Sequence, residues 1–156
     1  MESIRTKLEG KVVSITGASG YIGSALTQEL EKYSLKIIRI SRKKLVPRDG
    51  VEDWVLDLNK QSSWIRIVNK SDIIFHLSGN TSIYSAEKDP NESLKSTLFP
   101  IIQLINASKK ISRIPRVVFS STATVYGLTK ELPVLETSQP NPITTYDLHK
   151  FFAEQQ

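Results

Sequence analysis

The segment VVSITGASGYIGS, residues 12–24, predicts a strand, a glycine-rich loop and the start of a helix. It opens with a run rich in β-branched residues, which is typical of a buried strand, and glycines follow it at positions 17, 20 and 23. Gly17 permits a tight turn, Gly20 lets the backbone approach a phosphate, and Gly23 lets the next helix pack close to the strand. Such a loop holds a pyrophosphate at the positive end of a helix. We therefore predict a dinucleotide site, with an ordinary strand-to-helix turn as the alternative.

Four more apolar runs follow the first, at residues 37–40, 54–57, 73–77 and 117–121. All five are nearly continuous rather than alternating, so we expect strands that are buried on both faces. Helical patterns lie between them, with one apolar face at Ile22, Leu26, Leu30 and Tyr33 and another at Leu94, Leu98, Ile101, Ile102 and Ile105. Alternating strands and helices predict an α/β fold with a doubly wound, parallel, Rossmann-type sheet.

Length and composition narrow the class of protein. A chain of 156 residues suits a single domain, here residues 1–156, and it contains no cysteine. Two separated histidines, His76 and His149, do not suggest a metal site, so we expect no metal. Since no run of roughly 18 apolar residues occurs, we expect a cytoplasmic protein without a membrane span.

The chain is basic, with 21 Lys and Arg against 16 Asp and Glu and a net charge of +5. Basic clusters lie at residues 39–44 and 109–116, a pattern that can mark contact with nucleic acid. Aromatic residues that would stack on bases are not interleaved with these charges. We therefore favour a solvated surface or an anionic small ligand over a nucleic-acid partner.

The end of the second predicted strand bears on the choice of cofactor. A site that prefers NAD usually has Asp or Glu there, whereas this chain has Ser41 and Arg42. A hydroxyl and a guanidinium can hold the 2′-phosphate of NADP, which a carboxylate would repel. We therefore predict NADP as the cofactor, with NAD as the alternative. A basic surface loop without a role in binding is the other interpretation of these residues. Asp57, after the third strand, could accept from the adenine amino group or form a turn.

Three tyrosines have a lysine four residues later, one helical turn away: Tyr84 and Lys88, Tyr126 and Lys130, and Tyr146 and Lys150. Such a lysine can tune the pKa of the tyrosine. The first two pairs lie in poor settings for a helix. Tyr146 follows Pro142 and Thr144, which are helix start signals. Tyr146 and Lys150 are therefore the candidate acid–base pair.

Six short motifs occur in a characteristic order: TGASGYIGS at 16–24, DL at 57–58, HLSGNTS at 76–82, DP at 89–90, FSSTATVYG at 119–127 and YDLHK at 146–150. In these motifs the chain resembles the extended short-chain dehydrogenase/reductase family. That family comprises NAD(P)-dependent epimerases, dehydratases and reductases that act largely on nucleotide sugars.

The resemblance implies roles for individual residues. Tyr146 would be the acid/base, Lys150 would hold the nicotinamide ribose and lower the tyrosine pKa, and Thr122 would hydrogen-bond the reacting oxygen. Thr122 could instead only cap the end of its strand, and for His76 we favour plain packing. The residues implied in cofactor binding are Gly17, Gly20, Tyr21, Ile22, Gly23, Ser41, Arg42, Asp57, Leu58, Leu77, Ser78, Gly79 and Lys150.

Two positions depart from the family pattern. Thr97 stands where an Asn is usual, and Pro100 lies inside a predicted helix where Gly is frequent. An interior proline costs about 3 kcal/mol unless the helix kinks.

The resemblance also implies a further strand and a C-terminal substrate domain after the Tyr146 helix. We therefore expect a C-terminally incomplete sheet whose fifth strand is an exposed edge, uncovered Phe151 and Phe152, and self-association. A homodimer is one form this could take. The expected function is that of an epimerase, dehydratase or reductase for a nucleotide sugar, with little turnover by this part alone. A non-catalytic NADP-binding or sensor module is the alternative.

Overall fold

The computed structural model describes residues 4–129 and 132–156, and the chain divides into two compact units. The first unit extends to Ser78 and resumes over Gln103–Ser120. The second unit comprises Gly79–Ile102 and Ser121–Gln156. The glycine loop belongs to the first unit and the tyrosine–lysine pair to the second.

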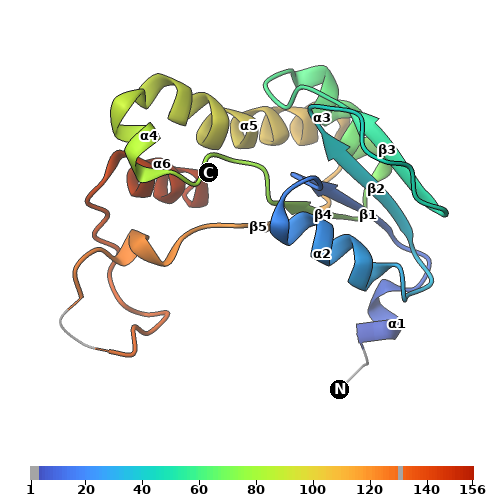
Figure 1. Ribbon diagram of the computed structural model, residues 1–156, viewed down its shortest axis with the longest axis horizontal. Helices are drawn as coiled ribbons and strands as arrows, with labels where there is room; N and C mark the ends of the chain where they lie inside the picture. The colour runs from blue at the N-terminus through green and yellow to red at the C-terminus, as the bar shows by residue number, and fades with distance from the viewer. Residues whose placement is uncertain (1–3, 130–131) are drawn as a thin grey trace. The chain divides into compact units, whose positions relative to one another are not determined.

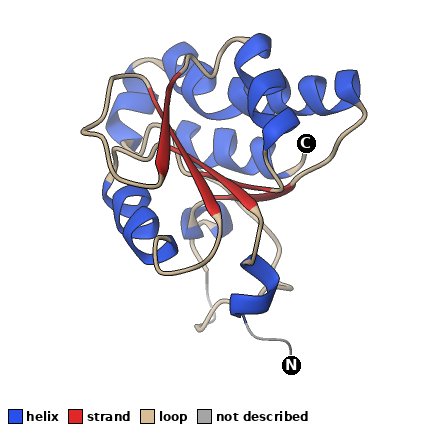
Figure 2. Ribbon diagram, turned by 90° about the vertical axis from the view of Figure 1, so that its right-hand side faces the viewer, coloured by secondary structure: helices blue, strands red, loops and turns tan. Residues whose placement is uncertain are grey.

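The first unit is built on a five-stranded sheet in the order β3-β2-β1-β4-β5 (Figure 1). Its strands are β1 (Val12–Thr16), β2 (Lys36–Ser41), β3 (Val51–Val55), β4 (Ile73–His76) and β5 (Arg116–Phe119). Every neighbouring pair is parallel, and the strands twist relative to one another (Figure 2). The predicted parallel, doubly wound α/β sheet is confirmed.

The two edge strands differ from the prediction. β3 begins at Val51, directly after Gly50 with its φ of +73°, and ends before Asp57. Burial on both faces is wrong for β3 and β5, because each has only one neighbouring strand. Val55 of β3 is 55% exposed, and Val118 of β5 is 42% exposed. The expected exposure of the fifth strand is therefore observed.

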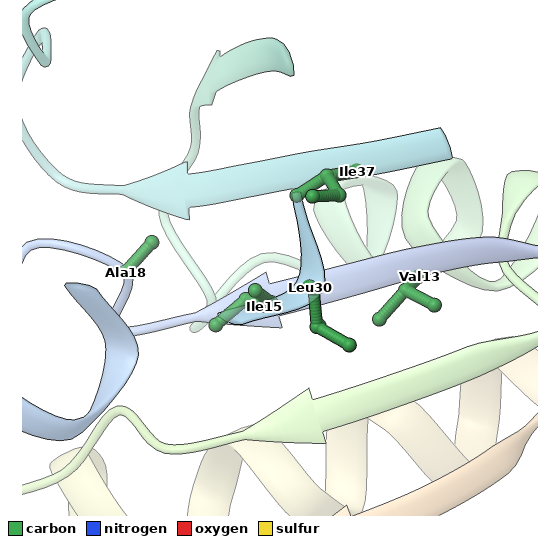
Figure 3. Close-up of a cluster of buried hydrophobic side chains, with 5 residues drawn as sticks. All are labelled: Val13, Ile15, Ala18, Leu30 and Ile37. Atoms are coloured by element: carbon green, nitrogen blue, oxygen red, sulfur yellow. The ribbon is translucent and has the colours of Figure 1, made fainter. Parts of the chain in front are cut away.

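One side of the sheet is covered by α2 (Tyr21–Leu30), which forms an apolar core with the two central strands. The side chains of this core are Val13, Ile15, Ala18, Leu30 and Ile37 (Figure 3). The predicted apolar face of the helix is correct for Leu26 and Leu30. It is wrong for Ile22, which is 60% exposed because it lies in the first turn, and Tyr33 follows the helix.

The opposite side of β1 buries polar side chains that hydrogen-bond to one another. The hydroxyls of Ser14 and Ser71 are 2.6 Å apart, and Thr16 Oγ1 is 2.7 Å from His76 Nδ1. Trp64, on α3 (Gln61–Lys70), meets the His76 ring edge-on at 5.3 Å between ring centroids. His76 is fully buried among these residues, so its expected packing role is confirmed.

The second unit holds α4 (Ile83–Lys88), the 3-10 helix η1 (Ala123–Tyr126) and α6 (Thr145–Glu154). α5 (Pro90–Ile111) begins in this unit and ends in the first, where α1 (Ile4–Leu8) also lies. α5 continues through Pro100.

The buried face of α5 contains Ser93, Thr97, Ile101, Leu104 and Ala107. Leu94, which was predicted to lie on the apolar face, is 38% exposed, so the buried face is rotated around the helix relative to the prediction. Phe152 of α6 is 44% exposed, as expected.

Gly23→Ala should destabilise the first unit strongly. A methyl group at this position would overlap the Gly17 carbonyl oxygen and approach Ala18 Cα to 2.8 Å. Overpacking of backbone against backbone should lower the free energy of unfolding by about 2 kcal/mol or more in urea denaturation. Ser24→Ala, at the next and exposed position of α2, is the control and should change it by less than about 0.5 kcal/mol. Equal stability of the two variants would contradict the proposed close contact.

Candidate functional site

The glycine loop brings three backbone segments together. Gly17 has a φ of +68°, and a Cβ added to it would lie 2.8 Å from Ser78 N and 2.9 Å from Leu77 C. A Cβ added to Gly23 would likewise overlap the Gly17 carbonyl oxygen. The turn and the close packing that the sequence predicted for Gly17 and Gly23 are therefore present.

The loop presents the beginning of α2 to solvent. Gly20 is the N-cap of this helix and has no side chain that could accept from the first-turn N–H groups. Tyr21 is 93% exposed and Ile22 is 60% exposed. These N–H groups are thus available to an anion such as a pyrophosphate. The chain's own residues fit the phosphate part of a dinucleotide.

Ser41 and Arg42, the two residues at the end of β2 that bear on cofactor choice, differ in their exposure to solvent. Ser41 is buried, and its hydroxyl donates to the carbonyl of Lys43. Arg42 is exposed, as are Lys43 and Lys44. Of the two, Arg42 is therefore the group that can reach an anion in solution.

Arg39 corrects the interpretation of residues 39–44 as a wholly solvated cluster. It is 7% exposed, and its guanidinium donates to both carboxylate oxygens of Asp53 at 2.7 Å and to the carbonyl of Val46 at 2.7 Å. No local sequence pattern predicted this pairing, because Asp53 lies on a different strand.

The remaining residues predicted to line the cofactor lie at the carboxyl ends of β3 and β4. Asp57 forms a turn, because its Oδ1 accepts from Asn59 N at 3.0 Å, and the Leu58 carbonyl accepts from the Trp64 indole. Ser78 bonds to Thr16 Oγ1 through its N–H and its hydroxyl. Leu77 packs against the core. Gly79 lies in the second unit.

In the second unit, α6 begins with a capping box. Thr144 Oγ1 accepts from Asp147 N, and Asp147 Oδ2 accepts from Thr144 N, both at 3.2 Å. The predicted helix start is confirmed. Tyr146 and Lys150 are 8% and 4% exposed, and the ammonium nitrogen lies 6.0 Å from the centre of the tyrosine ring.

Burial, rather than helical setting, distinguishes this pair from the other two. Tyr84 and Lys88 do lie on a helix, α4, because Ser82 caps it by accepting from Ser85 N at 3.1 Å. The expectation of a poor helix setting there was wrong, yet Tyr84 is 76% exposed. Tyr126 lies in η1, and Lys130 lies outside the described residues.

The ionisation of the pair is governed mainly by burial. Burial raises the pKa of Tyr146, a hydrogen bond with Thr122 opposes this, and the charge of Asp147 raises it further. Burial lowers the pKa of Lys150 to about 8, with Glu154 acting in the opposite direction. The expected lowering of the tyrosine pKa is therefore not produced by the chain's own groups, and the net shift is upward.

Gly79 lies close to both the Lys150 ammonium group and the backbone of α5. A Cβ on Gly79 would lie 3.6 Å from Lys150 Nζ and 3.8 Å from the Ser96 carbonyl oxygen. Pro100 has no N–H, so this carbonyl lacks the donor that an α-helix ordinarily provides four residues later. Thr97 Oγ1, at the usual Asn position, is buried and has no hydrogen-bond partner among the described residues. The proline thus leaves the Ser96 carbonyl, which lies close to Gly79, without its usual helical donor.

Two residues near the pair were missed in the sequence. Thr124 Oγ1 donates to Asp147 Oδ1 and lies 2.8 Å from Thr122 Oγ1. A sequence signal existed only for Asp147: it lies three residues after Thr144, which is the spacing of a capping box with Asp in place of Glu. His149 also proves to be buried, and its Nδ1 lies 2.9 Å from Ser93 Oγ.

The described ranges, residues 4–129 and 132–156, also bear on a metal site and on a membrane span. They contain no group of three or more metal-ligating side chains and no helix long and apolar enough to cross a membrane. A cavity of about 430 Å³ lies at the amino ends of β2 and β3, lined in part by Tyr33, Ile37 and Val51. It is at the opposite end of the strands from the glycine loop.

A parallel sheet with this glycine loop after its first strand is a Rossmann-type fold. The sequence profile of the NAD dependent epimerase/dehydratase family matches residues 13–156. The chain therefore belongs to the NAD dependent epimerase/dehydratase family.

Individual relatives agree with this assignment. UDP-glucose 4-epimerase of Mycoplasma genitalium is 27% identical over 158 residues, covering 91% of this chain and 46% of that protein. Dihydroflavonol 4-reductase of Gerbera hybrida is 29% identical, covering 81% of this chain and 38% of that protein. The structure of MoeE5 in complex with UDP-glucose and NAD superposes with a TM-score of 0.82 at 27% identity, covering 94% of this chain and 47% of that one. The chain spans less than half the length of each.

Lys150→Met should stabilise the protein at neutral pH, and this advantage should vanish in alkali. The folded pKa of about 8 lies below the ordinary value of 10.5, so below pH 8 the buried charge costs about 3 kcal/mol. Between pH 8 and 10.5 the unfolded state binds more protons, so wild-type stability rises with pH relative to the variant. Urea denaturation of both proteins at pH 7 and pH 10 measures this. A difference that does not change with pH would show that Lys150 titrates normally.

Proposed function

We propose that this chain is the cofactor-binding part of an NAD(P)-dependent enzyme that acts at a hydroxyl or carbonyl carbon of a nucleotide sugar, as an epimerase, dehydratase or reductase. The observation that carries the proposal is the buried Tyr146–Lys150 pair with Thr122 as the hydrogen-bonding neighbour of the tyrosine. Membership of the family and the epimerase relatives support the substrate class.

Each residue has a role that its environment supports. A tyrosine with a raised pKa is protonated at neutral pH, so Tyr146 would donate its proton to a substrate oxygen and later recover it. Lys150 would bind ribose hydroxyls as a charged donor. Thr122 would hold the reacting oxygen. Gly17, Gly20 and Gly23 would leave room for the pyrophosphate. NAD(P), when bound, supplies the hydride acceptor or donor.

The preference for NADP over NAD is a finer proposal, and it rests on Arg42. The Ser41 hydroxyl is already donated to Lys43, which leaves the exposed guanidinium of Arg42 to pair with a 2′-phosphate. No carboxylate occupies the end of β2 to repel that phosphate.

A non-catalytic NADP-binding or sensor module is the second candidate. The raised pKa of Tyr146 favours it, because a tyrosine that does not ionise readily is a poor base. Turnover against a panel of nucleotide sugars and carbonyl compounds distinguishes the two functions.

Tyr146→Phe tests the proposed chemistry, in the protein as it is naturally expressed. Only the phenolic oxygen is lost, so turnover of UDP-sugars, followed by chromatography, should fall at least about 100-fold. NADPH binding, followed by fluorescence titration, should be unchanged. Tyr84→Phe is the matched control, because Tyr84 has the same spacing to a lysine but is exposed. Near-normal turnover of Tyr146→Phe would assign the acid to another residue.

Arg42→Ala tests the cofactor preference by titration of this chain with NADPH and NADH. Loss of one charge-assisted contact should weaken NADPH binding about tenfold or more and leave NADH binding unchanged. Lys36→Ala, an exposed change at the amino end of β2, is the control. Tighter binding of NADH than of NADPH by the wild type would exclude the NADP preference.

A further inference from the structure

The first unit carries a group of exposed cations that the proposed function does not use. Lys109 and Lys110 lie in the last turn of α5. Arg113 lies in the connection that follows, and Arg116 begins β5. Lys70 lies in the last turn of α3. All five residues are exposed, and we call them the basic edge, because they lie where β4 and β5 begin, at the opposite end of the strands from the glycine loop.

Hydrogen bonds bring the basic edge together around the carboxylate of Asp72. Arg113 Nη2 donates to the Ser71 carbonyl at 3.0 Å and to Asp72 Oδ1 at 3.1 Å. The backbone N–H of Arg116 donates to the Asp72 carbonyl at 2.9 Å. Because Lys70 directly precedes Ser71, the end of α3 and the connection after α5 lie side by side.

Acidic residues do not balance the charge of the basic edge. Segments 60–71 and 103–120 contain no Asp or Glu. Asp72 is already engaged, because its Oδ2 accepts from Val12 N at 2.9 Å and its Oδ1 accepts from Arg113. Among the residues that the structure describes, the other four cations have no carboxylate within ion-pair distance. The ends of α3 and α5 add only about half a negative charge each, so the edge attracts anions.

An exposed apolar side chain lies among these cations. Ile114 is 90% exposed, although both of its neighbours are fixed: Arg113 is bound to Ser71 and Asp72, and Pro115 is buried. A single exposed isoleucine is ordinary on a protein surface. Surrounded by unpaired cations, however, it matches the surface of an anionic bilayer, where charges meet lipid headgroups and an apolar group enters the boundary of the acyl chains.

We propose that the basic edge is a docking surface for an anionic lipid bilayer, with Ile114 inserted below the headgroups. Lysine and arginine side chains near such a bilayer are attracted by its negative surface potential. The glycine loop stays accessible, because it lies at the other end of the strands. The proposal therefore goes beyond the proposed function and does not depend on it.

Nucleic acid is the other polyanion that a basic surface can bind, and the observations favour it less. Residues 109–116 contain no aromatic side chain that could stack on bases. Phosphate contacts would use the cations alone and would leave Ile114 in solvent. Dependence of binding on Ile114 therefore distinguishes a bilayer from a nucleic acid.

The experiment is flotation of the protein, as it is naturally expressed, with lipid vesicles. Vesicles of phosphatidylcholine with about 30% phosphatidylserine should bind the wild type at an ionic strength of about 0.05 M and release it at about 0.5 M, because salt screens the attraction. Vesicles of phosphatidylcholine alone should not bind it.

The double variant Lys109→Gln/Lys110→Gln should bind the anionic vesicles about tenfold more weakly or worse, because it removes two cations from the basic edge. Lys43→Gln/Lys44→Gln is the matched control. It removes an adjacent pair of exposed lysines at the carboxyl end of β2, with the same loss of net charge, and should leave vesicle binding within about twofold of the wild type.

Ile114→Ser should weaken vesicle binding about fivefold or more, because the inserted apolar group is lost. Its binding of a polyuridine RNA, followed by fluorescence anisotropy, should match that of the wild type. Val46→Ser, at an 84% exposed position between β2 and β3, is the control and should not change vesicle binding. Since Ile114 is exposed, this variant tests the proposal even where the double lysine variant destabilises α5.

Equal losses of vesicle binding in the two lysine variants would overturn the proposal, because net charge rather than the basic edge would then be responsible. Flotation that Ile114→Ser leaves unchanged would overturn it as well. Absence of flotation would do the same, and binding of RNA in that case would assign the edge to a nucleic acid.

Discussion

The first unit is organised around the close approach of two strand ends at Gly17. The carboxyl ends of β1 and β4 come so close there that a Cβ on Gly17 would lie within 3 Å of the backbone of Leu77 and Ser78. The same loop allows α2 to begin directly against the Gly17 carbonyl. A side chain at either glycine would separate the central strands from α2, and the apolar core between them would lose its packing.

The parts of the fold that depend on local sequence were predictable. β1, the glycine loop and the start of α6 are each specified by residues within a few positions of one another, such as Thr144 and Asp147. The edge strands were less predictable, because exposure of Val55 and Val118 depends on which strands lack a second neighbour. The buried face of α5 escaped prediction for a similar reason: it contains Ser93 and Thr97, which look like solvent-facing residues until their partners are known.

The candidate site, too, was predictable only in the features that depend on local sequence. Spacing and a helix start identified Tyr146 and Lys150, but Tyr84 and Lys88 on α4 show that a helical setting alone does not distinguish a buried pair. The direction of the Tyr146 pKa was missed because it depends on burial by groups distant in sequence. The contact of Thr124 with Asp147 spans 23 positions and joins two elements whose proximity no local pattern reveals.

The buried pair of Arg39 and Asp53 has a consequence for how the sheet is assembled. These residues are directly opposed in the register of β2 and β3. A slip of β3 by two residues would place Val51 or Val55 opposite Arg39 and leave the guanidinium buried without its carboxylate, at a penalty of about 3–5 kcal/mol. Apolar neighbours alone would tolerate such a slip far better, because Ile38 and Ile40 are similar in shape. The pair therefore acts chiefly against misaligned forms of the protein, and it sets the register of β3, an edge strand that pairs only with β2.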